Sequence, residues 1–140
     1  MYLDGDNSPL IGKTIKKIAL SKDQTILVFI LSNGEHVVCE AVADCCSESW
    51  FADITGVNVL LQGLIKQIEL MDLDLPQDER CRQESDSFYG IKIKTDKGDA
   101  DIIFRNSSNG YYGGWLEVKE YIENHHNRDD FIEITKDYTA

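Results

Sequence analysis

The sequence contains no long apolar run. Within its 140 residues, no apolar stretch approaches the roughly 20 residues that a membrane-spanning helix needs. The segment before Leu10 lacks the basic start and apolar centre of a secretory signal, and it carries Asp4 and Asp6 instead. These absences predict a soluble, cytoplasmic protein that does not act at a membrane.

Basic side chains are scarce in this sequence. It has 14 lysines and arginines against 25 acidic residues, which gives a formal net charge of −11. Such a charge repels the phosphates of DNA and RNA and argues against direct nucleic-acid binding. The same charge attracts a protein with a basic surface, although acidity also serves solubility alone.

The signatures of metal and cofactor sites are missing as well. The cysteines, Cys39, Cys45, Cys46 and Cys81, form no Cys-x-x-Cys pair and have no histidine at a zinc spacing. Neither a phosphate-binding P-loop nor a dinucleotide glycine fingerprint occurs. We therefore expect no metal site, no cofactor, and free thiols in a reducing compartment.

Length and residue pattern predict one α+β domain. Residues 1–12 are rich in turn formers and are expected to be a flexible arm, and residues 13–140 to form the domain. Alternating apolar residues predict about seven or eight strands, mainly in an antiparallel sheet. The expected strands are a three-strand meander over 14–43, with a hairpin at Asn33-Gly34, and segments 64–70, 87–95, 100–104, 115–119 and 131–134.

Two segments predict short helices packed on this sheet. The first is 47–54, which Ser47 or Ser49 can cap and which places Trp50 on its apolar side. The second is 56–62, closed by Gly63. Both are too short to be stable without packing against the sheet.

The segment 71–86 concentrates acidic side chains around Pro76. With only Arg80 and Arg82 to oppose them, it is expected to be a solvated, mobile loop. Loops of this length are more often functional than shorter ones.

The most distinctive stretch is polar, glycine-rich and aromatic and covers 104–115. It follows a buried strand, so it is expected to form a shaped loop. Its arginine, amides and rings suit a nucleotide-like small molecule or a protein interface, whereas a tight turn whose rings fill the core is the alternative. The candidate binding residues, two of them from the first predicted helix, are Glu48, Trp50, Arg105, Asn106, Asn109, Tyr111, Tyr112 and Trp115.

A catalytic cysteine is a further hypothesis. Cys45 or Cys46 near a helix start can have a lowered pKa. A nucleophilic cysteine also needs a base such as His36, His125 or His126 close in space, and the sequence does not show one. We therefore assign no catalytic residue.

Three motifs together resemble a known family. They are DCCSESWF at 44–51, FYG at 88–90 followed by TDKG at 95–98, and FRNSSNGYYGG at 104–114. Over roughly Leu10 to Val118 the sequence is similar to small uncharacterised domains of bacteriophages, prophages and related bacterial sequences. The resemblance implies no activity, but it implies a protein that is located in the cytoplasm of a bacterial host.

Charge and resemblance together favour a non-enzymatic phage or prophage accessory protein. It would bind and inhibit a host component with a basic surface, such as a defence nuclease. The alternatives are a protein that sequesters a nucleotide-like signal and a cysteine-dependent enzyme. Edge strands also make a homodimer compatible with the sequence.

Overall fold

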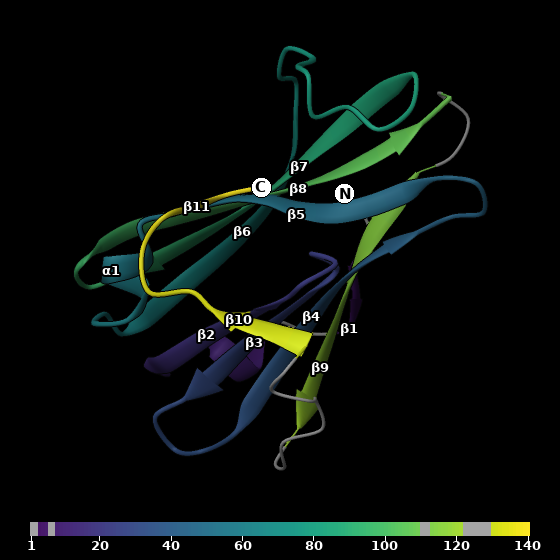
Figure 1. Ribbon diagram of the computed structural model, residues 1–140. Helices are drawn as coiled ribbons and strands as arrows, with labels where there is room; N and C mark the ends of the chain where they lie inside the picture. Colours follow the sequence, from purple (N-terminus) through teal and green to yellow (C-terminus); the bar gives the residue numbers. More distant parts are fainter. Residues whose placement is uncertain (1–2, 6–7, 110–112, 122–129) are drawn as a thin grey trace.

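Two β-sheets packed face to face make up the fold (Figure 1). The computed structural model describes residues 3–5, 8–109, 113–121 and 130–140. The strands are β1 (Leu3–Gly5), β2 (Ile15–Ser21), β3 (Ile26–Leu31), β4 (His36–Ala43), β5 (Glu48–Thr55), β6 (Ile65–Leu73), β7 (Ser85–Thr95), β8 (Gly98–Ser108), β9 (Gly114–Tyr121), β10 (Phe131–Glu133) and β11 (Tyr138–Thr139). The helical elements are a 3-10 turn, η1 (Ser8–Leu10), and one short helix, α1 (Val57–Leu60).

The strand order places the predicted meander at the centre of the first sheet. This six-stranded sheet runs β1-β9-β4-β3-β2-β10, and the five-stranded sheet runs β11-β5-β8-β7-β6. Among the described ladders only β1 and β9 pair in parallel. The expectation of a mainly antiparallel sheet is confirmed, but the fold is mainly β rather than α+β with two helices.

The predicted hairpins are confirmed where glycine permits the turn. Gly34 has φ of 91°, and its N–H donates to the carbonyl of Leu31 at 3.0 Å between β3 and β4. Gly98, with φ of 137°, opens β8 after the turn from β7. These backbone angles are strained for other residues, so the glycines set where each strand pair turns.

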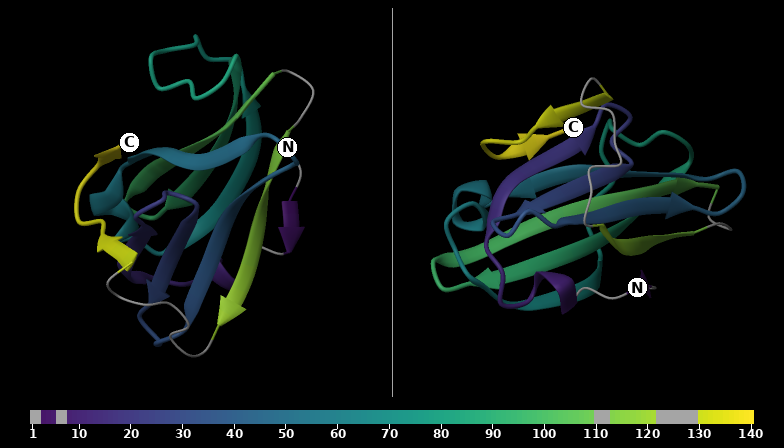
Figure 2. Two further views of the ribbon diagram at one scale, coloured as in Figure 1. Left: turned by 45° about the vertical axis from the view of Figure 1, so that its right-hand side comes forward. Right: turned by 90° about the horizontal axis from the view of Figure 1, so that it is seen from below.

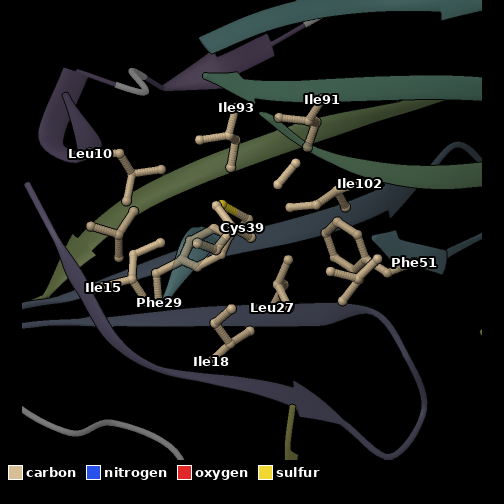
Figure 3. Close-up of a cluster of buried hydrophobic side chains, with 14 of the residues drawn as sticks. Leu10, Ile15, Ile18, Leu27, Phe29, Cys39, Phe51, Ile91, Ile93 and Ile102 are labelled. Atoms are coloured by element: carbon tan, nitrogen blue, oxygen red, sulfur yellow. The ribbon is translucent and has the colours of Figure 1, made fainter. Parts of the chain in front are cut away.

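The hydrophobic core fills the space between the two sheets (Figure 3). The first sheet contributes Ile18, Leu27 and Phe29, and the second contributes Phe51 and Ile102 to the same cluster. Burying side chains of this size stabilises the fold by roughly 1.5–3 kcal/mol each relative to exposure. Both sheets therefore depend on one shared core.

Residues 48–54 lie in strand β5, and the predicted helix there is wrong. β5 pairs with β8 through Trp50↔Arg105 and Phe51↔Phe104, with a bulge between Phe51 and Asp53. Trp50 and Phe51 are both buried, because the core covers one face of β5 and a later segment covers the other. A bulged strand buried on both faces loses its alternation, which made the pattern look helical.

The second predicted helix is confirmed in shortened form as α1. Gly56, at the start of the helix, has φ of 78°. The N–H groups of Gly56 and Val57 donate to Oδ1 of Asp137 at 3.0 and 3.1 Å. A carboxylate from the C-terminal segment thus satisfies donors that the first turn of a helix leaves open.

Two further strands escaped the sequence patterns because they are only two or three residues long. β1 lies in residues 1–12, the segment predicted to be a flexible arm, and pairs with β9 through Leu3↔Leu116. Leu10 from the same segment packs into the core at 3% exposure. β11 pairs with β5 and covers that edge of the second sheet.

The described helical elements are short. In this part of the chain, no helix is long and apolar enough to cross a membrane.

Candidate functional site

The second half of β8 is polar and yet buried. Arg105 is 2% exposed, and Asn106, Ser107 and Ser108 are equally enclosed. The stretch 104–115 was predicted to be a loop from its polarity, but β8 continues through Ser108 between β5 and β7. The loop prediction is therefore wrong for its first half, and hydrogen bonds must satisfy these side chains.

A segment that we call the strap, residues 74–84, closes over the outer face of this part of the sheet. It joins β6 to β7 and rises above β7 and β8 at the top of Figure 1. The hydroxyl oxygen of Ser107 accepts the backbone N–H groups of Arg82 at 3.0 Å and Gln83 at 2.9 Å. The mobile loop predicted over 71–86 is instead two strand ends and a tethered connection.

Arg105 holds the strap from below. Its guanidinium donates to both oxygens of Asp78 at 2.7 Å and to Oδ2 of Asp86 at 2.9 Å. The Arg105 hydrogen bonds hold the pKa of Asp78 well below its usual range, and Asp78 and Asp86 raise the pKa of Arg105. Arg105, a candidate binding residue in the sequence, is thus a permanent internal cation whose two terminal nitrogens bind carboxylates of this chain.

Two other arginines of the strap extend the network. Arg80 bonds Asp53 of β5 at 2.9 Å and Asp78 at 3.1 Å. The guanidinium carbon of Arg82 lies 4.0 Å from the ring centre of Trp50, a cation–π geometry. Trp50, a candidate binding residue in the sequence, is 1% exposed beneath the strap.

The remaining predicted site residues near β8 split between buried and exposed positions. Asn106 is buried, and its amide donates to the hydroxyls of Ser47 at 3.1 Å and Ser49 at 3.0 Å. Glu48 is exposed and accepts a long hydrogen bond, 3.4 Å, from the Gln83 amide. Asn109 is exposed just after β8 ends.

The described aromatic members of the predicted site lie on different sheets, with Trp50 opposite Arg105 on β5 and Trp115 elsewhere. Trp115 is half-buried on β9, in the other sheet. Gly114 lies so near Asn106 that a Cβ there would be 3.0 Å from the Asn106 amide nitrogen. Tyr111 and Tyr112 lie outside the described residues.

A pocket of about 380 Å³ opens beside the strap. Asp86 lines it, and its side chain is fully buried. Oδ2 of Asp86 bonds Arg105, but Oδ1 has no hydrogen-bond partner among the described residues. Leaving a buried charged oxygen unpaired costs free energy, so a hydrogen-bond donor brought to this oxygen would stabilise the carboxylate.

The rest of the lining agrees with a cationic ligand. Exposed Asp72 and Asp74 contribute negative charge, and Phe88 and Tyr89 contribute aromatic surface. The complete lining is Asp72, Leu73, Asp74, Leu75, Gln77, Asp86, Ser87, Phe88 and Tyr89. Carboxylates beside aromatic rings form a site that an ammonium or guanidinium group fits.

The cysteine hypothesis loses one of its three candidate bases. Cys45 and Cys46 follow the C-terminal end of β4, whereas His36 begins that strand. At about 3.3 Å per residue the two ends of β4 are about 23 Å apart, so His36 and Cys45 lie at opposite ends of this strand. His125 and His126 are outside the described residues. Within the described chain, no group of three or more His, Cys, Asp or Glu residues can hold a metal ion.

Comparison with known proteins places this chain in a family. Residues 8–118, which include the strap and all of β8, match the family described as Domain of unknown function (DUF7448). The chain belongs to this family. It is 33% identical over 129 residues to an uncharacterised protein of Acanthamoeba polyphaga mimivirus, an alignment covering 85% of this chain and 97% of that protein. No solved structure matches the chain.

The resemblance read from the sequence is thus confirmed in a coarser form. The DUF7448 domain of this chain is an uncharacterised domain that has a viral relative. A phage or prophage origin stays a prediction.

Sequence reasoning singled out Arg105 but missed the carboxylates that bind it. Asp78 and Asp86 lie 27 and 19 residues earlier in the chain. The two arginines Arg80 and Arg82, close behind Asp78 in an otherwise acidic segment, are the one signal that could have indicated an ion-pair network.

Proposed function

We propose that this protein is a non-enzymatic binding protein that takes a basic side chain of a partner protein into the pocket beside the strap. The observation that carries the proposal is the buried Asp86 carboxylate, which lines the pocket and has one oxygen without a described hydrogen-bond partner. A lysine or arginine side chain supplies the missing donor and the opposite charge.

The charge around the pocket supports the same occupant. Arg80 and Arg105 are engaged by internal carboxylates and do not extend outward to neutralise the strap. Exposed acidic residues line the pocket and lie along the strap: Asp72, Asp74, Glu79 and Glu84. Such a field speeds the approach of a basic partner and repels nucleic acid.

The finer proposal concerns the partner. A viral relative and an acidic docking surface support an accessory protein of a virus, phage or prophage that inhibits a host component. Host defence nucleases have basic nucleic-acid grooves, and an acidic protein can occupy such a groove.

A nucleotide-like ligand is not favoured. Both terminal nitrogens of Arg105 already bond carboxylates, and Asn106 donates to two serine hydroxyls. An anion would have to displace Asp78 and Asp86 from that guanidinium.

The binding proposal can be tested by NMR titration of the full chain with a short oligo-arginine peptide. We expect amide shifts concentrated at Asp72, Asp74, Asp86 and Tyr89, and weaker binding by Asp72→Asn with Asp74→Asn. The matched control is Asp99→Asn with Asp101→Asn, which removes the same charge from exposed positions of β8. Equal weakening by both double variants would show that only net charge attracts the peptide.

Inhibition needs its own measurement. Purified host defence nucleases should lose activity when the protein is added, and the pocket double variant should restore that activity. Undiminished nuclease activity, with no complex on size-exclusion chromatography, would leave the binding proposal standing and refute inhibition of those enzymes.

A further inference from the structure

Two adjacent thiols lie together on the turn between β4 and β5. Cys45 and Cys46 are both exposed, and their sulfur atoms are 3.1 Å apart. In the right-hand view of Figure 2, this turn (blue) protrudes at the right-hand end of the molecule. By contrast, Cys39 is buried in the core and Cys81 is half-buried against Ser107.

The turn itself holds the thiols in this arrangement. Cys46 has φ of 69°, a left-handed conformation that is uncommon for a residue with a side chain. Asp44 fixes the turn from both sides, because its Oδ1 accepts the N–H of Cys45 at 2.9 Å and its carbonyl accepts the hydroxyl of Ser47 at 2.7 Å. The Gln83 amide of the strap donates to the carbonyl of Cys46 at 3.1 Å.

We propose that Cys45 and Cys46 form a reversible thiol–disulfide site that reacts with low-molecular-weight disulfides of the glutathione class. One thiolate attacks glutathione disulfide, forming a mixed disulfide and releasing one glutathione thiolate. The second thiolate attacks the mixed disulfide, forming the Cys45–Cys46 bond and releasing the second glutathione. Two protein thiols are oxidised and one glutathione disulfide is reduced, with both thiol protons passing to the released glutathiones.

Adjacent positions explain why the bond is reversible. Neighbouring Cα atoms are about 3.8 Å apart across a trans peptide. Ordinary disulfides join Cα atoms about 4.4–6.8 Å apart, so a bond between neighbours is strained. Strained and exposed disulfides are the ones that are readily reduced and passed on to other thiols.

The hydrogen bond with Cys46 raises the pKa of the Cys45 thiol. The two sulfur atoms are only 3.1 Å apart, so a mixed disulfide formed on either cysteine lies within reach of the other thiol, which resolves it.

The test incubates the reduced full chain with excess glutathione disulfide at neutral pH, blocks free thiols with iodoacetamide, and maps the peptides by mass spectrometry. We expect the peptide containing both cysteines to lose two hydrogen atoms and to carry neither glutathione nor iodoacetamide. Excess reduced glutathione should return it to the dithiol. Cys39, which burial protects, serves as the internal control.

Single variants then separate this site from general thiol reactivity. Cys45→Ser should accumulate a stable glutathione adduct on Cys46, because the resolving thiol is gone. Cys81→Ser should behave like the unaltered chain. A persistent adduct in the unaltered chain, a Cys46–Cys81 bond, or a disulfide-linked dimer as main product would overturn the proposal.

Discussion

The two halves of β8 bury side chains for opposite physical reasons. In the first half, Ala100, Ile102 and Phe104 face the shared core and are at most 1% exposed. In the second half, Arg105 and Ser107 are at most 2% exposed beneath the strap. One strand therefore passes from burial driven by the hydrophobic effect to burial sustained by specific hydrogen bonds and ion pairs.

This difference predicts how each half responds to mutation. An apolar contact can be replaced by another of similar size, because hydrophobic burial has no direction. An ion pair fails when one member is removed, because its partner stays buried and unpaired. Conservative substitutions in the first half of β8, the core half, should therefore cost little stability. Single substitutions in the second half, the polar half, should each cost much more.

The largest effect is expected for Arg105→Ala. It leaves the fully buried Asp86 without its counter-ion, so the free energy of unfolding should fall by about 3–5 kcal/mol. Phe104→Ala should cost a similar amount, about 3–5 kcal/mol, through a core cavity. Urea denaturation of both variants measures the two losses.

Repair distinguishes the two causes. Arg105→Met combined with Asp86→Leu replaces the ion pair by apolar groups and should recover most of the loss. Two results would contradict this account of the second half of β8. One is a double variant as unstable as Arg105→Ala, and the other is a loss of less than about 1 kcal/mol for Arg105→Ala itself.

A smaller and local effect is expected for Ser107→Ala. It removes the oxygen that accepts the N–H groups of Arg82 and Gln83, which should cost the closed strap about 1–3 kcal/mol. Hydrogen exchange of those two amides should quicken roughly 5-fold to 150-fold, since 1.4 kcal/mol is a factor of about ten. The amide of Ile102 in the core half is the control, and equal quickening there would indicate global unfolding instead.

The smallest expected effect is a pH dependence of the stability that comes from the ion pair between Asp78 of the strap and Arg105 of β8. The pKa of Asp78 is lowered by Arg105, so its contribution to stability is complete above the unfolded-state value of about 4 and is lost as pH falls below it. Asp78→Asn should cost about 1 kcal/mol at pH 7. That difference should shrink between about pH 5 and pH 2 in denaturant titrations, and a constant difference would refute this role of Asp78.

Much of the fold could be predicted because its strands obey simple local rules. β3, β4 and β7 alternate or turn at glycines, and those signals lie within a few residues. β5 could not be predicted from such a pattern, since Trp50 is covered by an arginine 32 residues later in the chain. Burial by a distant segment leaves no trace in local periodicity.

The site shows the same limit. Arg105 was singled out because an arginine that follows a buried apolar run needs an explanation, and that reasoning was sound. Whether its partner is a ligand or an internal carboxylate depends on how the strap folds back. Asp78 and Asp86 are two among 25 acidic residues, and composition cannot choose between them.

The edges of the sheets carry a consequence for self-association. Three of the four edge strands in the described chain, β1, β10 and β11, are two or three residues long, whereas β6 has nine. Only β6 gives a second molecule enough free backbone to extend the sheet. Lys66, Glu69 and Asp72 lie along this edge strand, and charged side chains oppose the pairing of one edge strand with another. Replacing them with apolar residues should therefore favour aggregation through β6.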